Sequence, residues 1–476
     1  MKNSNPNILL IMTDQLRADA LGCYGNCICK TPNIDKFTQS GIRFDRAYTT
    51  IPVCSPARSS IMTGLYPHNH KVMLNTHIDT RTTRGLDPNI NTFSRSLAGK
   101  GYHMEYFGKW HVHEDYDPLQ YGFHNYTPSK WNWDKSRWYD EIYIDFLKGR
   151  QLVSAKTNAP YTEEASYKLA RSAEEFLHQY NKQAEDKAPF FMRVDFIRPH
   201  FPSIVPEPFA AMYDGSEIPP WPNFGDNYTN KPAGHQRKNQ EWALQDKDWN
   251  WWSKVVAMYY ANVSYLDFCC GIILDALENE GLNEETLVVF TSDHADSIGS
   301  HNHFEKGGTM YEEVLRIPLM MRWPGKTCAE SVDSHFVRNM DLMPTFIRAA
   351  GGIPPGDIDA IDLTTLLEDS VLPNEWPDSV FAEYHGDVWG SYTQRMVRTQ
   401  DYKYIYNPYD LDELYDLKVD PYEMENRIAD PDYSEIRNNM RGRLHGWIKQ
   451  SKDVLTHTFV TRNFPDPIYP KMPCKT

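Results

Sequence analysis

The sequence predicts an α/β fold, with a large, mostly parallel sheet flanked by helices and a smaller C-terminal unit that has an antiparallel sheet and a helix. Continuous apolar runs are typical of strands covered on both faces, as in parallel sheets. Such runs span Asn7 to Met12, Phe190 to Ile197 and Thr286 to Phe290. Helical patterns lie between them, from Glu163 to Tyr180 and from Val255 to Glu280. Strands that alternate with helices favour a parallel sheet.

Polar residues follow each of the three predicted strands. They include Asp14 and Gln15 after the first, His200 after the second, and Asp293 and His294 after the third. In open α/β sheets, ligands bind beyond the carboxyl ends of the strands. We therefore expect these side chains to lie close together at one edge of the sheet.

The character of the chain changes after a predicted helix from Asp341 to Ala350. Beyond it, short Tyr-rich segments predict the strands of a small antiparallel sheet, closed by a helix from Tyr433 to Gln450. The segments are Met396 to Thr399, Tyr402 to Tyr406 and Glu413 to Leu417. We divide the chain into a catalytic domain of residues 1–365 and a C-terminal α+β subdomain of residues 366–476.

Charge and hydropathy limit the classes of partner. The 476 residues include 49 Lys and Arg against 64 Asp and Glu, a formal net charge of −15 that repels polyanions. We therefore expect neither nucleic acid nor a membrane as a partner. The polar start and the short apolar run to Met12 are too short for a signal peptide or a membrane span. A cytoplasmic protein is expected, although a cleaved signal peptide would leave the same pattern.

The most informative segment runs from Pro52 to Gly64. Pro56 suits the first turn of a helix, where its missing N–H costs nothing, so Cys54 is expected at a helix N-terminus that favours anions. Arg58 lies one turn further on and can reach back to the same spot. On chemistry alone, Cys54 is either a thiolate nucleophile or a buried structural cysteine.

The Cys-x-Pro-x-Arg element at Cys54 to Arg58 is part of an ordered set of motifs that resembles the sulfatase family. The set covers nearly the whole chain and comprises Asn7 to Asp14, Gly22 to Gly25, Thr31 to Asp35, Cys54 to Gly64, Phe107 to His111, Ser292 to His294, Lys306 to Gly325 and Glu413 to Pro421. The resemblance implies an alkaline phosphatase-like fold and hydrolysis of a sulfate ester. We expect a small-molecule or oligosaccharide substrate, with a carbohydrate sulfate as the first choice.

The same resemblance implies that the nucleophile is made after translation. A separate maturation enzyme would oxidise Cys54 to Cα-formylglycine, which hydrates to a geminal diol. One hydroxyl would attack the sulfur, and the other would later expel the sulfate as the aldehyde forms again. A hydroxyl needs a metal ion or cationic neighbours to become an alkoxide near neutral pH.

A divalent metal site is expected at the strand ends. Asp14 and Asp293 supply hard oxygen ligands, and likeness to the family adds Gln15 and His294. Gln15 is neutral, and an imidazole suits Mn²⁺ better than Ca²⁺. The two aspartates make Ca²⁺ the first choice for the cofactor, and the departures at Gln15 and His294 keep Mn²⁺ and Mg²⁺ as alternatives.

Four further residues complete the expected catalytic set. Lys109 and His111 are separated by one residue, so on a strand they would point to the same face, where an anion would relieve their repulsion. By likeness to the family, Lys109 contacts the formylglycine and the sulfate, and His111 removes a proton from the diol. His200 resembles the histidine that protonates the leaving alcohol, and Lys306 resembles the lysine that holds the sulfate. Asn75 and His70 are within reach of the pocket, without an assigned role.

Two other functions stay open. A phosphonate monoester or phosphodiester hydrolase of the same superfamily shares the cysteine motif and the metal set, but that branch has neutral hydroxyl side chains where this chain has Lys109 and His111. A non-catalytic binder of sulfated glycans would use the Trp-rich stretches at Trp131 to Tyr143 and Trp221 to Trp252. Those aromatic rings either stack on a sugar or pack the loops themselves.

Overall fold

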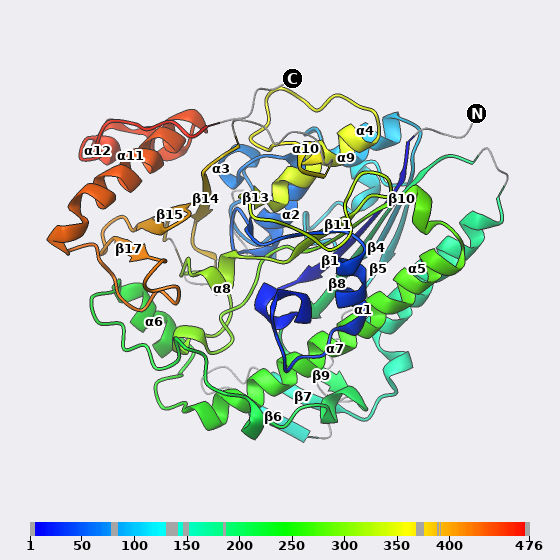
Figure 1. Cartoon of the computed structure of the whole chain (residues 1–476), viewed down its shortest axis with the longest axis horizontal. Coiled ribbons are helices and arrows are strands. Elements are labelled where there is room, and N and C mark those ends of the chain that lie inside the picture. The colour runs from blue at the N-terminus through cyan, green and yellow to red at the C-terminus, as the bar shows by residue number, and fades with distance from the viewer. Residues whose placement is uncertain are drawn as a thin grey trace.

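The computed structural model of the chain describes residues 5–77, 84–129, 141–145, 152–183, 187–367, 376–387, 390 and 392–471. Among these residues, a mixed sheet of eight strands forms the centre of the molecule (Figure 1). In order across the sheet, the strands are β12 (Ser331–Asp333), β2 (Ile42–Phe44), β11 (Leu319–Arg322), β10 (Thr286–Ser292), β1 (Asn7–Asp14), β8 (Phe190–Pro199), β4 (His103–Gly108) and β5 (Asn125–Pro128).

The predicted parallel core of the sheet is confirmed. Strands β10, β1, β8, β4 and β5 run parallel, so the three strands predicted from apolar runs lie side by side at the centre. The antiparallel strand β11, between β10 and β2, makes the sheet mixed. The sequence did not indicate β11 or β2, because both are short.

Residue alternation along β1 explains why both faces of the sheet are buried. Leu9 and Ile11 pack on one side, in a cluster shared with α7 (Trp249–Asn279), α5 (Ala165–Asn181) and α1 (Pro32–Gln39). Ile8 and Leu10 pack on the other side, with α2 (Cys54–Thr63), α4 (Phe93–Gly99) and α9 (Leu342–Ala349). Since successive side chains of a strand point to opposite faces, a continuous apolar run fits this three-layer arrangement.

Helix α7 is long and apolar enough to cross a membrane by length and composition, but 89% of its most apolar window is buried inside the protein. It packs against α5 and the central sheet, so its composition reflects a core helix. The helix begins at Trp249, six residues before the predicted start, because the side chain of Asp248 accepts the main-chain N–H of Trp251 at 2.9 Å.

The C-terminal antiparallel sheet is also confirmed, and it contains one strand that was not predicted. The strands are β14 (Ser379–Tyr384), β15 (Gln394–Thr399), β16 (Tyr402–Tyr406) and β17 (Glu413–Asp416), and α11 (Ser434–Gln450) packs against them. Figure 1 shows this unit, in orange and red, beside the large sheet. The boundary between residues 365 and 366 stays a prediction.

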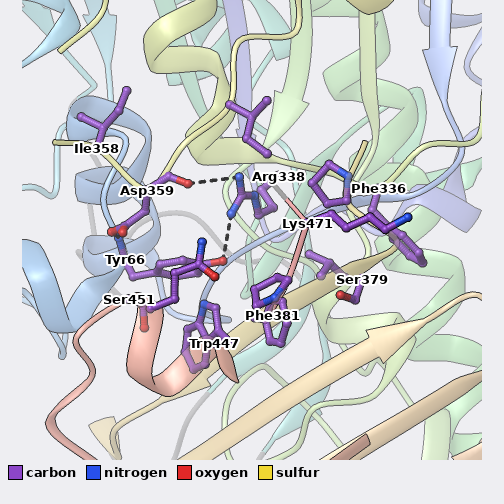
Figure 2. A pocket seen from close by; sticks show the side chains of 15 residues that line it. Tyr66, Phe336, Arg338, Ile358, Asp359, Ser379, Phe381, Trp447, Ser451 and Lys471 are labelled. Atoms are coloured by element: carbon purple, nitrogen blue, oxygen red, sulfur yellow. Dashed lines mark hydrogen bonds between the residues drawn. The ribbon is translucent and has the colours of Figure 1, made fainter. Parts of the chain in front are cut away.

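A cavity of about 360 Å³ lies in the seam between the two units (Figure 2). Tyr66, which follows helix α2, lines it together with Phe381 and Trp447 from the C-terminal unit. Figure 2 also shows Arg338 donating to the Tyr66 hydroxyl at 2.9 Å. The cavity therefore lies near the C-terminal end of α2, whereas Cys54 lies at its N-terminal end.

The Trp-rich stretches give a partial answer to the question of sugar stacking. The stretch from Trp131 to Tyr143 lies outside the described residues, apart from the backbone of β6 (Glu141–Asp145). In the second stretch, Trp252 is fully buried, and Trp221 and Trp249 pack edge to face. This second stretch therefore packs the loop itself.

Candidate active site

The ends of the three central strands meet, as predicted, and helix α2 adds the cysteine. Asp14 is the last residue of β1, Asp293 directly follows β10, and His200 directly follows β8. Cys54 is the first residue of α2, where the main-chain N–H groups of a helix attract negative charge. Asp14, Asp293 and Cys54 are buried at the carboxyl edge of the sheet, and His200 is partly exposed.

The environment of Cys54 favours an anion. Its Sγ lies 3.2 Å from Nε2 of His294, and the side chain is 1% exposed. Burial alone raises the pKa of the thiol, but the positive charges of Lys109, Lys306 and His294 hold that pKa well below its usual range. A protein of net charge −15 thus holds a local positive field around one side chain.

Arg58 fixes the floor of the site. Its guanidinium donates to Asp293 Oδ2 at 2.8 Å, to Asp14 Oδ2 at 3.1 Å and to Asp195 Oδ2 at 2.8 Å. All these side chains are fully buried, and Arg193 also donates to Asp195 at 2.8 Å. Arg58 therefore orients the two carboxylates of the predicted metal site, as its position one turn into α2 allows.

Three of the four predicted metal ligands fit a divalent cation. Oxygen atoms of Asp14 and Asp293 and a ring nitrogen of His294 lie within 4.8 Å of one another, together with Cys54. Nδ1 of His294 donates to the carbonyl oxygen of Ala295 at 3.0 Å, so Nε2 faces the cluster and could bind an ion once the ring has lost its second proton. Burial and the charge of Asp14 raise the pKa of Asp293, so a cation bound between the two carboxylates would stabilise their charged forms.

Gln15 lies beside this cluster. Its main-chain N–H donates to Asp293 Oδ1 at 3.3 Å, and its side-chain Oε1 accepts from Lys306 Nζ at 2.9 Å. The side-chain amide donates to Asp296, a buried carboxylate that sequence reasoning missed. A second lone pair of Oε1 is available to a metal ion, and the role of Gln15 as a ligand stays a prediction.

Lys109 and His111 both reach Cys54, but not from a strand as predicted. Strand β4 ends at Gly108, whose φ of 104° turns the chain, and His111 has a φ of 52° in the left-handed region. Nζ of Lys109 bonds to Asp14 Oδ2. Burial and the charge of Lys109 lower the pKa of His111 to about 4, so its ring is neutral near pH 7.

His200 and Lys306 lie together on the other side of the cluster. Nζ of Lys306 lies 2.7 Å from Nε2 of His200 and 3.1 Å from the carboxylate of Glu305. Burial opposes the charge on Lys306, but Cys54 and Glu305 raise the pKa of its ammonium, so it stays positive. The structure thus brings together all the predicted catalytic residues.

The sequence placed Asn75 and His70 within reach of the pocket. In the structure, Asn75 lies at the site and His70 does not. Asn75 Oδ1 accepts the main-chain N–H of Ser55 at 3.1 Å, so it does lie at the site. His70 instead lies 3.0 Å from the hydroxyl of Ser60, inside α2, and burial lowers the pKa of its ring to about 3. His70 is thus a packed histidine.

Other residues of the site were missed. His77 hydrogen-bonds through Nδ1 to Nε2 of His111 at 3.1 Å, and Asp387 accepts two hydrogen bonds from Asn75. Burial raises the pKa of Asp387 to about 6. Nothing near Asp387 in the sequence signals a site, because it comes from the C-terminal unit and reaches the site only through folding.

Comparison with known proteins gives the family. Residues 6–353 match the family model of the sulfatases, and residues 299–450 match that of the C-terminal part of N-sulphoglucosamine sulphohydrolase. The chain is 30% identical over 467 residues to the uncharacterized sulfatase YidJ of Escherichia coli K12, covering 94% of this chain and 88% of that protein. It is 27% identical to an N-acetylglucosamine-6-O-sulfatase of Bacteroides thetaiotaomicron, covering 95% and 88% of the two chains.

Solved structures agree with these matches. A protein in complex with its substrate D-glucosamine-2-N,6-O-disulfate superposes with a TM-score of 0.79 at 25% identity, covering 95% of this chain and 99% of the other. A phosphonate monoester hydrolase of Agrobacterium radiobacter superposes with a TM-score of 0.76 at 26% identity, covering 94% and 96%. With the family model matching most of its length and a site of this composition, the chain belongs to the sulfatase family and is a sulfuric ester hydrolase.

Proposed function

We propose that this sulfatase hydrolyses the sulfate ester of a carbohydrate, with a formylglycine made from Cys54 as nucleophile and with Ca²⁺ held by Asp14, Gln15, Asp293 and His294. A maturation enzyme that oxidises Cys54 is the implied partner, and Mn²⁺ or Mg²⁺ is the alternative ion. The observation that carries the proposal is the surrounding of Cys54 by positive charge, which lowers the pKa of its thiol although the thiol is buried.

The metal ion and the hydrated formylglycine would supply a hydroxyl nucleophile that ionises near neutral pH. The residues of the chain then do the rest. Lys109 and Lys306 offer ammonium groups to the sulfate oxygens, where negative charge must be held in the transition state. His111, neutral at pH 7, can take a proton from the nucleophile. His200 can give a proton to the departing alcohol.

The carbohydrate part of the proposal is supported by the relatives. The N-acetylglucosamine-6-O-sulfatase and the complex with a disulfated glucosamine are both named for sugar sulfates. Sugar alcohols are poor leaving groups, so a proton donor such as His200 matters for them.

The phosphonate hydrolase is the second candidate, because one solved neighbour is named as such. The metal set of this chain fits both classes. Lys109 and His111 favour the sulfatase. Both side chains interact with Cys54, whereas the phosphonate hydrolase branch has neutral hydroxyl side chains at these two positions. The non-catalytic glycan binder is disfavoured by the intact set of nucleophile, cations and metal ligands around Cys54.

Two measurements test the proposal. Mass spectrometry of the peptide from Ala47 to Arg58, from protein made with a maturation enzyme, should show an aldehyde in place of the Cys54 thiol. Fully active protein with only unmodified cysteine would bring back the thiolate mechanism.

On paired esters of one alcohol, the specificity constant should be higher for the sulfate monoester than for the phosphonate monoester or the phosphodiester. The opposite order would assign the chain to the phosphonate hydrolases. If neither ester is hydrolysed, the non-catalytic binder of sulfated glycans is the remaining function.

A further inference from the structure

A carboxylate from the C-terminal unit lies at the edge of the active site. Asp387, three residues after the end of β14, accepts the main-chain N–H of Asn75 on Oδ1 and the side-chain amide of Asn75 on Oδ2, both at 3.1 Å. Asn75 Oδ1 in turn accepts the main-chain N–H of Ser55 at 3.1 Å. Ser55 is the neighbour of Cys54, so a single asparagine side chain joins the start of the nucleophile helix to Asp387.

Asp387 is held in place and still has acceptor capacity. The two bonds from Asn75 use one lone pair on each carboxylate oxygen, and a carboxylate offers about four such positions. The residue is partly exposed, whereas Asp14 and Asp293 are fully buried and engaged with Arg58. Among the described residues, Asn75 alone donates to this carboxylate, so its other positions can accept hydrogens from a bound molecule.

Apart from the metal-site carboxylates of Asp14 and Asp293, the charged side chains next to Cys54 are cationic, and further carboxylates lie beyond them. Lys109, Lys306 and His294 surround the nucleophile position. Beyond them, among the described residues, Asp387 lies close enough to Cys54 and Lys306 for their charges to interact, and Glu305 adds a further negative charge beside Lys306. A sulfate on the nucleophile faces cations, whereas a second anion on the same sugar would face Asp387.

We propose that Asp387, positioned by Asn75, selects the alcohol half of the substrate by accepting hydroxyl hydrogens of a sugar that carries one sulfate and no other charge. The inference rests on the proposed function and narrows its substrate class to monosulfated, otherwise neutral sugars. A second sulfate or a carboxylate near the ester meets a fixed negative charge and is disfavoured. Substrate choice would thus come from the C-terminal unit, while the chemistry comes from the large sheet.

The test compares Asp387→Asn, Asp387→Ala and the control Asp357→Asn, which changes an exposed aspartate. The substrates are regioisomeric O-monosulfates of glucose and N-acetylglucosamine, O-sulfated N-sulfoglucosamine and O-sulfated glucuronate as sugars with a second anion, and 4-nitrophenyl sulfate. We expect wild type to prefer the monosulfated sugar at least tenfold in kcat/KM. Asp387→Asn, which keeps the shape but removes the charge, should reduce this preference at least fivefold.

Asp387→Ala should lower kcat/KM for the monosulfated sugar at least tenfold, chiefly through KM, and should lower turnover of 4-nitrophenyl sulfate much less, because that substrate has no hydroxyl for Asp387 to bind. Asp357→Asn should match wild type on every substrate. An unchanged preference in both Asp387 variants, with their 4-nitrophenyl sulfate turnover retained, would overturn the inference alone. Wild type that cleaves the aryl sulfate but no sugar sulfate would instead overturn the carbohydrate assignment, and this inference with it.

Discussion

Nζ of Lys306 lies 2.7 Å from Nε2 of His200, and Nδ1 of the same ring lies 2.6 Å from the carbonyl oxygen of Phe201. An ammonium only donates and a carbonyl only accepts, so this imidazole is neutral and carries its hydrogen on Nδ1. The nitrogen that faces Lys306 is therefore an acceptor in the free enzyme. To act as the acid that the resemblance implies, His200 must first gain a proton on this nitrogen.

The first prediction concerns His200 as the acid. His200→Gln should lower kcat for a sugar sulfate by roughly 10²-fold or more, the usual contribution of a general acid. It should lower kcat for 4-nitrophenyl sulfate by far less, because that leaving group departs without a proton. Steady-state kinetics on both substrates decides the matter. Equal losses on the two substrates would mean that His200 only holds Lys306.

A second prediction concerns the buried guanidinium of Arg58. Arg58→Met leaves Asp14, Asp195 and Asp293 without their shared partner, and breaking a buried ion pair costs about 3–5 kcal/mol of unfolding free energy. Thermal and urea denaturation should show this loss. The control Arg237→Met removes an arginine that is 75% exposed, and it should change stability little. Equal stability of the two variants would contradict the role of Arg58.

Metal removal is the third prediction. Chelation should abolish activity and lower the melting temperature, because an ion that binds only the folded state stabilises it. Asp293→Asn should lose the ion, measured by elemental analysis of the purified protein, whereas Asp357→Asn should retain it. Add-back of Ca²⁺, Mn²⁺ and Mg²⁺ in parallel identifies the ion. An ion-free enzyme with full turnover would contradict the metal site at Asp14, Asp293 and His294.

The fourth prediction concerns the pH dependence of stability. His68 donates through Nδ1 to Glu383 at 2.6 Å and through Nε2 to the carbonyl oxygen of Ser451 at 3.0 Å, so the ring carries both protons. Burial opposes this charge, but Glu383 raises the pKa of His68 from 6.5 to about 9. A raised pKa in the folded state means that the stabilisation is full below pH 6.5 and is lost as the pH rises through about 9.

Through this pair, wild type should lose about 2–3 kcal/mol of unfolding free energy between pH 6.5 and 9, and His68→Gln should not show this loss. Denaturant titrations at several pH values measure it. His178 bonds to Glu280 at 2.8 Å in a partly exposed pair, so His178→Gln should leave the slope of wild type. If the unfolding free energy of His68→Gln changes with pH as steeply as that of wild type, His68 and Glu383 do not form a stabilising ion pair.

Much of the fold could be predicted because the central strands are covered on both faces. Strand β1 is buried along its whole length, and a short continuous apolar run of this kind is typical of a strand in a parallel sheet. Strands β2 and β11 have three and four residues, too few for a pattern to emerge. The C-terminal strand β14 was missed because the predicted strands there were recognised by Tyr-rich segments between turn residues.

The site was predicted where it follows strand ends and missed where folding alone assembles it. Asp14 and Asp293 follow apolar runs, so their position at the sheet edge could be inferred. Asp195 lies inside β8, and the sequence does not tell that its side chain meets Arg58. Asp387 depends on the docking of two distant segments, which residue patterns do not encode.

If Cys54 is oxidised as proposed, its burial sets an order of events in the life of the protein. Its side chain is 1% exposed, and every residue of helix α2 is buried between the sheet and the surrounding chain. The maturation enzyme that we propose would need access to Cys54, which the folded chain buries. Under this proposal, oxidation and folding would compete for the same chain, and a molecule that folded first would keep its unmodified thiol. The yield of working enzyme in a cell would then depend on the speed of folding as much as on the supply of the modifying enzyme.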